Sequence, residues 1–425
     1  LKIKKEDILC ISFTNDSVNS LKNALLKNYN YDIDVFTFHK LALNILKDNK
    51  NIVNIASSDE LDYIITEYFY SNFSGLNILG KKEEFYELKK LIGTFINLFK
   101  SNNYDYIKFD EILKKLKYGN DYIFIKIVRE IYFEYMSELK SKNEVDFNDM
   151  INDAIKVLNK KGKIKPYKYI IIDEYQDTSY IRFLFIKELV DKMNCNLLVV
   201  GDDFQSIYRF TGCDVSLFLN FKEYFNNAKI MKIENTYRNS QELIKIAGNF
   251  VMKNPKQIKK NLHSGKHLNN PVKIIYYDNF ISELKKLIEK IYLETNKPIL
   301  ILGRNNKDIN MIFDDDIVLG DNNKLIYKKN SNINIYFMTV HKSKGLEEEN
   351  VIIINLENKF LGFPNQIKDD KILRLVSKQF EKYPYSEERR LFYVALTRTK
   401  NYTYLLTPKN NKSIFISEIE QMIDK

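Results

Sequence analysis

The sequence is poor in cysteine, in glycine and proline, and in long apolar runs, and these shortages exclude several classes of protein. Only three cysteines occur, Cys10, Cys195 and Cys213, and none forms a C-x-x-C pair, which excludes a disulfide framework and a cysteine-based zinc site. No apolar run approaches the ~18 residues of a membrane span, and the charged first residues exclude a signal-peptide core. We therefore expect a cytoplasmic protein that does not enter a membrane.

Charge and ordinary core-forming side chains are abundant. Hydrophobic residues make up 44% and charged residues 29% of the 425 positions, which is typical of a folded protein of two or three domains. The net charge of +10 and the pI of about 9.0 favour an anionic partner, most commonly a nucleic acid. The chain is also crowded with Lys, Asn and Ile, so a compositional bias of the whole genome explains the charge equally well.

The periodicity of the first half predicts α/β structure interrupted by helices. Helical segments are expected at 15–26 and 39–46, and a long helical pattern without strands fills 57–142. The segment 8–13 is expected to be a short buried strand and 31–38 a second strand. The continuous apolar runs 169–172 and 196–200 predict strands of a parallel sheet covered on both faces.

A second α/β block follows. Its strand candidates are 271–277, 298–302, 333–340 and 351–355. The mostly polar stretch 305–332 is expected to be irregular. The predicted fold class is therefore α/β, with two such domains and an all-helical insertion in the first.

Acidic side chains follow two predicted strands directly. Asp173 and Glu174 come after the run 169–172, at the position where open parallel sheets bind their ligands. Such a pair suits metal-assisted hydrolysis, because one carboxylate can hold Mg²⁺ while its neighbour takes a proton from the attacking water. Lone Asp-Glu pairs are also common on protein surfaces, so the pair alone does not decide the function.

The longer string DEYQDT at 173–178 is far more specific, and it resembles the Walker B motif of the UvrD/Rep group of superfamily 1 helicases. Other segments resemble further motifs of that family in the same order, which argues against a chance match. They are SFTN at 12–15, TFH at 37–39, VDFND at 145–149, GDDFQSIYRFTG at 201–212, NTYRN at 235–239, TVHKSKGLE at 339–347 and EERRLFYVALTRTK at 387–400.

The resemblance implies two RecA-like parallel-sheet motor domains. Residues 1–50 and 144–235 would form the first, residues 51–143 the helical insertion, and residues 236–425 the second motor domain. Only about 100 residues separate NTYRN from TVHKSKGLE. The large accessory domain that some relatives insert there is therefore expected to be absent, as in the helicase IV-like branch.

The resemblance also implies a site for ATP and Mg²⁺. Asp173 would hold Mg²⁺, and Glu174 would orient or deprotonate the attacking water. Gln205 would sense the γ-phosphate, because an amide both donates and accepts hydrogen bonds. The other implied residues are Arg238 and Arg398 at the γ-phosphate, Tyr237 on the adenine and Glu347 at the ribose. The two acids and Gln205 would face the arginines across one cleft.

Single-stranded DNA and duplex junctions are the implied partners. Tyr208 and Phe210 would form a stacking platform, since base stacking on aromatic rings tolerates any sequence. Relatives often carry tryptophan where this chain has Phe210 and arginine where it has Thr211, so the grip there is expected to be weaker. The other implied DNA contacts are Thr14, Asn15, Phe38, His39 and His341.

The family's nucleotide site also needs a G-x-x-x-x-G-K-[ST] loop, whose backbone N–H groups and lysine hold the phosphates. The printed chain contains no such sequence, and its first residue, Leu1, falls about where the helix after that loop should end. We therefore expect a truncated record of an active enzyme, and we expect the fragment alone to hydrolyse ATP negligibly.

Three functional hypotheses follow. The first is an ATP-dependent DNA helicase that moves 3′ to 5′ on single-stranded DNA, with the direction implied by the resemblance alone. The second is a non-catalytic DNA-binding or regulatory module that keeps the helicase fold. The third is the motor of a helicase-nuclease, although no nuclease-like group of residues occurs up to Lys425. The sequence does not specify which proteins are its partners.

Overall fold

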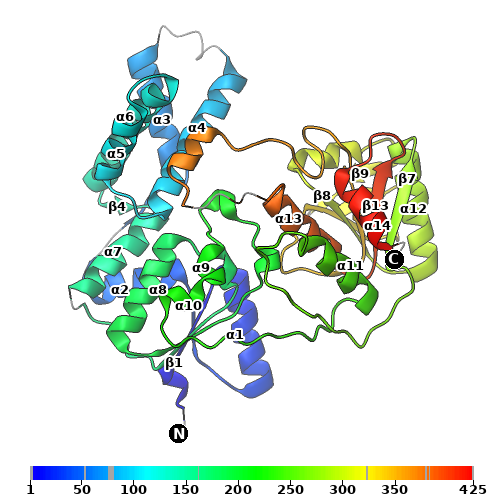
Figure 1. The fold of residues 1–425 in the computed structure, drawn as a ribbon, viewed down its shortest axis with the longest axis horizontal. Coiled ribbons are helices and arrows are strands. Elements are labelled where there is room, and N and C mark those ends of the chain that lie inside the picture. The colour runs from blue at the N-terminus through cyan, green and yellow to red at the C-terminus, as the bar shows by residue number, and fades with distance from the viewer. Residues whose placement is uncertain are drawn as a thin grey trace. The chain divides into compact units, whose positions relative to one another are not determined.

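Figure 1 shows the computed structural model, which describes residues 3–51, 54–74, 81–160, 162–321, 324–378, 381 and 383–423. The contacts divide the chain into two compact units. Unit 1 consists of Leu1–Asp202, Tyr208–Asn226 and Asp369–Phe380, and unit 2 of Asp203–Ile207, Asn227–Lys368 and Glu381–Lys425. Three stretches group differently from the expected domains, because 203–207 and 227–235 group with unit 2 and 369–380 groups with unit 1.

Unit 1 is built on a four-stranded parallel sheet. Its strands, in the order β2-β1-β5-β6, are β2 (Asp34–Thr37), β1 (Ile8–Ser12), β5 (Tyr169–Ile172) and β6 (Asn196–Val199). Successive side chains of a strand point to opposite faces. One face of the sheet packs against α1 (Asn15–Tyr29), and the other against α2 (Phe38–Asp48), α7 (Phe147–Asn159) and α8 (Tyr180–Met193). Two short helices, α9 (Ser216–Leu219) and α10 (Phe221–Tyr224), follow the sheet.

The last strand of this sheet departs from expectation. The run 196–200 does form β6, but β6 lies at the edge of the sheet, and alternate residues along it are exposed. Leu198, for example, is 55% exposed. The prediction of a strand covered on both faces was therefore wrong for β6, because a continuous apolar run does not reveal whether its strand is central or at an edge.

The described residues of the predicted helical insertion form four helices. They are α3 (Glu60–Phe73), α4 (Lys82–Ser101), α5 (Tyr106–Leu116) and α6 (Asn120–Ser141), and the two-residue strands β3 (Asn54–Ile55) and β4 (Glu144–Val145) pair in parallel where the insertion leaves and rejoins the sheet domain. Their core is aromatic: the rings of Phe99 and Phe109 stack with centroids 4.3 Å apart. The insertion therefore has its own hydrophobic core.

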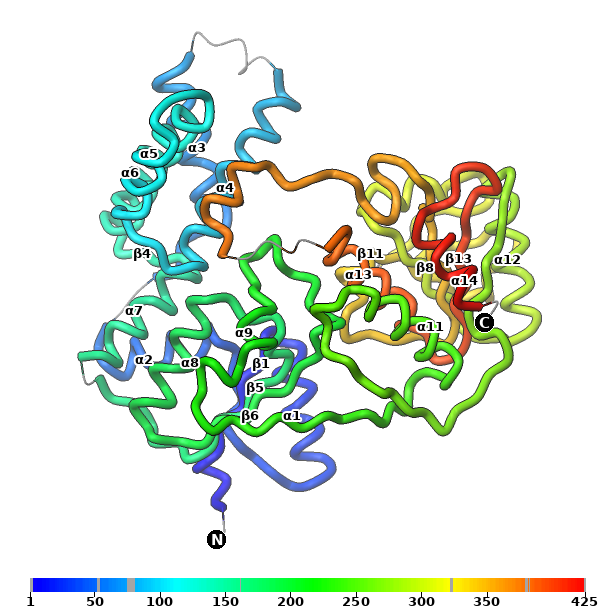
Figure 2. The backbone as a smooth tube through the Cα atoms, viewed as in Figure 1, coloured from blue at the N-terminus to red at the C-terminus, as the bar shows by residue number. Residues whose placement is uncertain are grey.

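A distant segment completes that core. Residues 369–378, here called the strap, contain a short 3₁₀ helix, Lys371–Leu375, whose residue Ile372 and the following Val376 are buried among the side chains of the insertion. The tube in Figure 2 shows the strap as an orange segment beside α4. No sequence pattern predicted this placement, since the strap lies more than 200 residues beyond the insertion.

Unit 2 contains a seven-stranded sheet in the order β7-β13-β12-β8-β11-β10-β9. Its strands are β7 (Val272–Tyr277), β13 (Thr399–Pro408), β12 (Glu348–Ile353), β8 (Ile299–Gly303), β11 (Ile335–Thr339), β10 (Lys324–Tyr327) and β9 (Ile317–Leu319). The first five are mutually parallel, and β10 and β9 continue the sheet antiparallel. The longer helices are α11 (Gln241–Val251), α12 (Phe280–Thr295), α13 (Ser386–Leu396) and α14 (Ile414–Ile423).

The stretch 305–332 was wrongly expected to be irregular. It holds a 3₁₀ helix at Asn306–Met311 and the two antiparallel strands β9 and β10. Each strand has only three or four residues, so its apolar run is too short to stand out among the surrounding Asp, Asn and Lys.

A search of the described helices for a membrane-spanning segment, which must be both long and apolar, finds none.

Candidate nucleotide and DNA sites

The acidic pair lies at the carboxyl edge of the unit 1 sheet. β5 ends at Ile172, so Asp173 and Glu174 follow it directly, and the side chain of Asp173 is exposed. The backbone N–H of Glu174 donates to Asp173 Oδ1 at 2.9 Å, and Glu174 adopts a left-handed backbone with φ 52°. The neighbouring strand β1 ends at the same edge, just before Thr14 and Asn15. The structure thus brings two sets of predicted site residues to one edge of the sheet.

Gln176, which is not among the site residues predicted from the sequence, holds Glu174 in place. Its buried amide donates from Nε2 to Glu174 Oε2 at 2.5 Å, and its Oε1 accepts from the backbone N–H of Asp202 at 2.9 Å. A Cβ on Gly201 would lie 2.5 Å from that Oε1, so the close approach requires glycine. The available signal was an amide inside the specific string DEYQDT, two residues after the candidate base.

The proposed stacking residues occupy a loop that is bonded to the acidic segment. We call residues 208–212 the aromatic loop. Its Phe210 is 54% exposed, and the Tyr208 ring lies 6.2 Å from it. Directly after the loop, Cys213 Sγ donates to the Asp177 carbonyl at 2.8 Å, and the Asp214 N–H donates to the Thr178 carbonyl at 3.0 Å. The aromatic loop and the acidic string are therefore fixed to each other within unit 1.

The TFH segment is more buried than a surface contact would be. Phe38 is 1% exposed and packs edge-on against Phe13 with ring centroids 5.1 Å apart, so its ring belongs to the core. His39 is half-buried against Phe147, and burial, with the nearby Arg182 charge, lowers its pKa to about 4. His39 is therefore neutral at pH 7, which suits hydrogen bonding better than attraction to phosphate.

In unit 2, the short segment 203–207 carries Gln205 and is anchored by a buried acid. Asp203 is fully buried, and its carboxylate pairs with Lys260 at 2.5 Å. The same carboxylate accepts hydrogen bonds from Gln257 Nε2 at 2.6 Å and from the Ile258 N–H at 2.8 Å. A buried charge needs such partners, because leaving it unpaired is strongly unfavourable.

The carbonyls of this segment are anchored as well. Arg390 Nε donates to the Ser206 carbonyl at 2.6 Å, while its two terminal nitrogens bind Glu381. Lys344 Nζ donates to the Gln205 carbonyl at 2.8 Å. Lys260, Arg390 and Lys344 thus fix the backbone around Gln205. None of the three is among the site residues predicted from the sequence, although Lys344 and Arg390 lie inside recognised motifs.

Arg398 lies beside the Gln205 side chain. It is 1% exposed, and its Nε and Nη1 donate to the carbonyls of Val394 at 3.0 Å and Leu346 at 3.3 Å. Its Nη2 lies 3.5 Å from Gln205 Oε1. The residue after Arg398 is fixed too, because the Asn239 side-chain amide donates to the Thr399 carbonyl at 2.5 Å. The structure therefore brings together Gln205 and Arg398, two residues predicted to act at the γ-phosphate.

The other predicted nucleotide residues of unit 2 lie near one another. Arg238 Nε pairs with Glu347 Oε2 at 2.6 Å, and this pairing holds the pKa of Glu347 below its usual value. Tyr237 is 91% exposed, so its ring is available to a ligand. His341 has its pKa lowered to about 4 by burial and by the Arg304 charge. It is neutral at pH 7, as His39 is.

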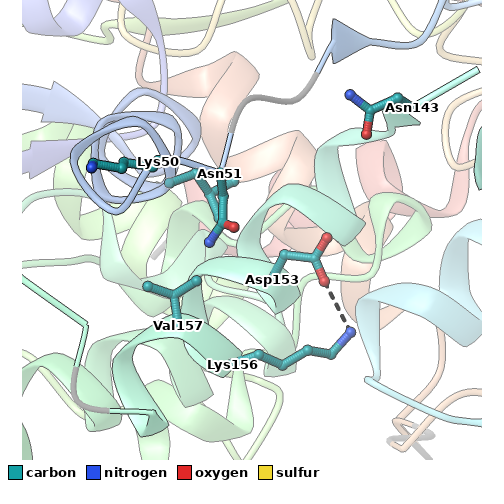
Figure 3. Close-up of a pocket in the computed structure, with 7 residues that line it drawn as sticks. Lys50, Asn51, Asn143, Asp153, Lys156 and Val157 are labelled. Atoms are coloured by element: carbon teal, nitrogen blue, oxygen red, sulfur yellow. Dashed lines mark hydrogen bonds and ion pairs between the residues drawn. The ribbon is translucent and has the colours of Figure 1, made fainter.

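In the part of the chain that the structure describes, neither a group of metal-ligating side chains nor the hollow in unit 1 adds a candidate site. Among the described residues, no three or more His, Cys, Asp or Glu side chains are grouped to hold a metal ion. A hollow of about 370 Å³ in unit 1 is lined by Leu46, Lys50, Asn51, Asn143, Asp153, Lys156 and Val157. Figure 3 shows its only marked interaction, the 2.9 Å pair between Lys156 and Asp153. The hollow contains no predicted nucleotide or DNA residue.

Comparison with known proteins identifies the family. Residues 1–226 match the UvrD/REP helicase N-terminal domain, and residues 315–410 match the UvrD-like helicase C-terminal domain. DNA helicase IV of Escherichia coli is 33% identical over 303 residues, which cover 70% of this chain and 42% of that protein. ATP-dependent DNA helicase PcrA of Bacillus subtilis is 28% identical over 67% of this chain and 38% of its own length.

A third relative, ATP-dependent DNA helicase Rep of Buchnera aphidicola, is 30% identical over 67% of this chain and 44% of its own length. The chain thus spans less than half the length of these curated relatives. A solved C-terminal domain of a possible DNA helicase from Lactobacillus plantarum aligns with a TM-score of 0.29 and 13% identity over 44% of this chain and 96% of that one, a likeness too weak to support an inference. The two domain matches together show that the chain belongs to the UvrD/Rep family of DNA helicases.

Proposed function

We propose that this chain carries the motor residues of an ATP-driven translocase that moves 3′ to 5′ on single-stranded DNA and separates duplexes at junctions. One observation carries the proposal: Cys213 and Asp214, the two residues directly after the aromatic loop, donate hydrogen bonds to the acidic string 173–178 within unit 1. A change at a bound nucleotide would therefore be transmitted to the residues that hold DNA. The direction of movement rests on family membership alone.

For ATP hydrolysis, Asp173 is the proposed Mg²⁺ ligand and Glu174 the residue that orients or deprotonates the attacking water. An exposed carboxylate at a strand end fits the hard, oxygen-preferring Mg²⁺ ion, which commonly takes only one or two protein carboxylates besides phosphate oxygens and water. When bound, Mg²⁺ neutralises charge on the phosphates. Gln176, through its bond to Glu174, keeps that carboxylate oriented.

The unit 2 residues are proposed to serve the same nucleotide. Gln205 and Arg398 would act as a pair at the γ-phosphate, because a planar guanidinium beside an amide offers several donors to developing negative charge. Arg238 is proposed to join them, with Glu347 at the ribose and Tyr237 on the adenine. The 2.6 Å bond between Arg238 and Glu347 supports a shared place of action for these two residues.

The proposed DNA partner is a single strand held by Phe210 and Tyr208, with Thr14, Asn15, His39 and His341 as further contacts. Stacking on an exposed aromatic ring contributes about 1–3 kcal/mol per base and does not depend on the sequence. The net charge of +10 supports binding to a phosphate backbone. Because Phe38 is buried, we propose that it shapes this region from within the core.

We further propose that the printed chain by itself hydrolyses ATP negligibly, since its sequence contains no G-x-x-x-x-G-K-[ST] loop. Phosphate release should be measured on this chain with and without a thymine oligonucleotide, and DNA binding by fluorescence anisotropy. We expect DNA binding without appreciable turnover. Brisk, DNA-stimulated turnover that is lost in Glu174→Gln would refute the inactivity while supporting the assigned base.

The same measurements separate the rival function. If the chain is a DNA-binding or regulatory module without catalysis, Glu174→Gln and Arg398→Lys should leave DNA binding unchanged. The same should hold for a chain to which a phosphate loop has been added. The motor proposal instead requires that restoring the loop produce DNA-stimulated hydrolysis that both substitutions abolish. Failure of the wild-type chain to bind single-stranded DNA would contradict both functions.

A further inference from the structure

The acidic string is not alone in fixing the aromatic loop, because other parts of unit 1 contact the loop as well. Gly212, at its end, has φ +91°, and a Cβ there would lie 2.2 Å from Ser101 Oγ. Ser101 is the last residue of α4 and is buried. The loop therefore lies directly against the end of a helix of the insertion, and only glycine fits at this contact.

The strap holds the loop from another side. Arg209, the residue before Phe210, places Nη2 2.6 Å from Asp369 Oδ2 of the strap, and both side chains are about one-third exposed. An isolated pair at this exposure would contribute little, because solvent screens it and two long side chains must be ordered. Its effect depends on whether the carboxylate is already held in place.

The strap is held firmly by the insertion and by the sheet domain. The buried amide of Asn102 donates to the Val376 carbonyl at 2.9 Å, and the Val376 side chain is fully buried. Lys378 places its ammonium 2.8 Å from the centre of the Tyr180 ring, at the start of α8. These contacts fix the backbone beyond Asp369, so its carboxylate is presented from an ordered segment.

We propose that Asp369 is a positioning residue for single-stranded DNA: held by the strap, it fixes Arg209 and with it the orientation of the Phe210 ring. This inference rests on the proposed function, in which Phe210 stacks on bases. A ring that is already oriented loses less conformational freedom on binding, so pre-ordering the loop strengthens binding without adding a contact to DNA. Asp369 itself carries the wrong charge to touch a phosphate.

Because Asp369 is negatively charged, electrostatics and positioning predict opposite effects when this charge is removed. Replacing Asp369 by asparagine removes a negative charge near the proposed DNA path, and simple electrostatics then predicts tighter binding. Positioning predicts the opposite. We expect Asp369→Asn to weaken binding of a fluorescein-labelled thymine oligonucleotide about two- to fivefold, the range that a surface ion pair contributes. The dependence of the binding constant on salt should not change, because no phosphate contact is lost.

Unit 1 offers a matched control. Asp110 pairs with Arg129 at 3.2 Å, with similar exposure of both side chains, and both lie on helices of the insertion. Asp110→Asn should therefore bind DNA as tightly as the wild type or slightly more tightly. In an Arg209→Gln background, Asp369→Asn should have little further effect, since the partner is gone. A persistent effect in that background would overturn the proposed route through Arg209.

A second readout follows the ring itself. The chain has no tryptophan, so Phe210→Trp places its single tryptophan at the stacking position, where the emission of that residue can be followed with selective excitation. We expect Asp369→Asn to lower the steady-state anisotropy of that tryptophan in the absence of DNA, whereas Asp110→Asn should leave it unchanged. Unchanged anisotropy together with unchanged or tighter DNA binding would overturn the inference.

Failure of the inference and failure of the proposed function give different results. If the wild-type chain binds DNA and Phe210→Ala weakens it, but Asp369→Asn does not, only the positioning role is wrong. If Phe210→Ala has no effect, the stacking platform itself is wrong, and the inference is overturned with it.

Discussion

Arg398 and Gln205 lie side by side in unit 2, with Nη2 of the arginine 3.5 Å from the amide oxygen of the glutamine. The amide comes from the segment after β6, a strand of unit 1, yet the segment is anchored among unit 2 side chains. The two groups therefore form one preassembled pair. The expectation that they act with Asp173 and Glu174 on one nucleotide stays a prediction.

Lys260→Met is expected to destabilise unit 2 by about 3–5 kcal/mol, because the fully buried Asp203 carboxylate would lose the ammonium group with which it pairs. Urea unfolding followed by circular dichroism measures this loss. Lys259→Met is the control, since that neighbouring lysine is exposed. Adding Asp203→Asn to Lys260→Met should recover part of the stability. Equal losses in the Lys259 and Lys260 variants would contradict the assignment.

Gly201→Ala is expected to cost about 1–3 kcal/mol, because its Cβ would lie 2.5 Å from the buried Gln176 amide oxygen. In a Gln176→Ala background the same substitution should cost clearly less, since the obstructing amide is gone. Thermal unfolding of the four proteins in this cycle gives the coupling. Gly265→Ala serves as control, because a Cβ there meets nothing within 4 Å. If the losses of stability caused by Gly201→Ala and Gln176→Ala are strictly additive, a Cβ at position 201 does not clash with the Gln176 amide.

Phe210→Ala is expected to weaken binding to a thymine oligonucleotide by about 1–3 kcal/mol, equivalent to roughly 5- to 150-fold, if the ring stacks on one base. Fluorescence anisotropy at fixed salt measures it. Phe133→Ala is the matched control, since that phenylalanine is 61% exposed on α6 of the same unit. A similar loss in both variants would mean that exposed aromatic rings in general, and not the aromatic loop, bind the strand.

Stability is expected to fall as the pH drops from about 6.5 towards about 4, partly because the folded protein holds His39 and His341 as half-buried neutral rings. Each has its folded-state pKa lowered from about 6.5 to about 4. Between these values the unfolded chain binds more protons than the folded one, so acid favours unfolding. Urea midpoints at pH 7.5 and pH 5 should differ less in His39→Gln than in the wild type. His263→Gln, at an exposed site, should behave as the wild type does.

Much of the fold could be predicted because the apolar runs are continuous. The run 169–172 became β5 with the same bounds, and the acids after it lie at the sheet edge where parallel strands end. Family membership followed from motifs whose residues are adjacent in sequence. Such local patterns predict the structure well, since a strand and the turn after it depend mainly on their own residues.

The remainder depended on contacts between residues that are distant in sequence. Gln205 follows a unit 1 strand, so nothing local indicated that Lys260 and Arg390 would hold its segment in unit 2. The burial of Val376 in the insertion core could not be predicted either, because an isolated apolar residue in a polar stretch shows no helical or strand periodicity. Buried polar partnerships such as that of Gln176 also depend on tertiary placement.

The strap has a consequence for how the protein matures. During synthesis the insertion helices emerge from the ribosome more than 200 residues before Ile372 and Val376 do. Until then the aromatic core of the insertion lacks two of its side chains, and its exposed apolar surface is open to chaperones or to another nascent chain. The order of translation thus makes the final closing of this subdomain a late event, completed only when the second half of the chain has been made.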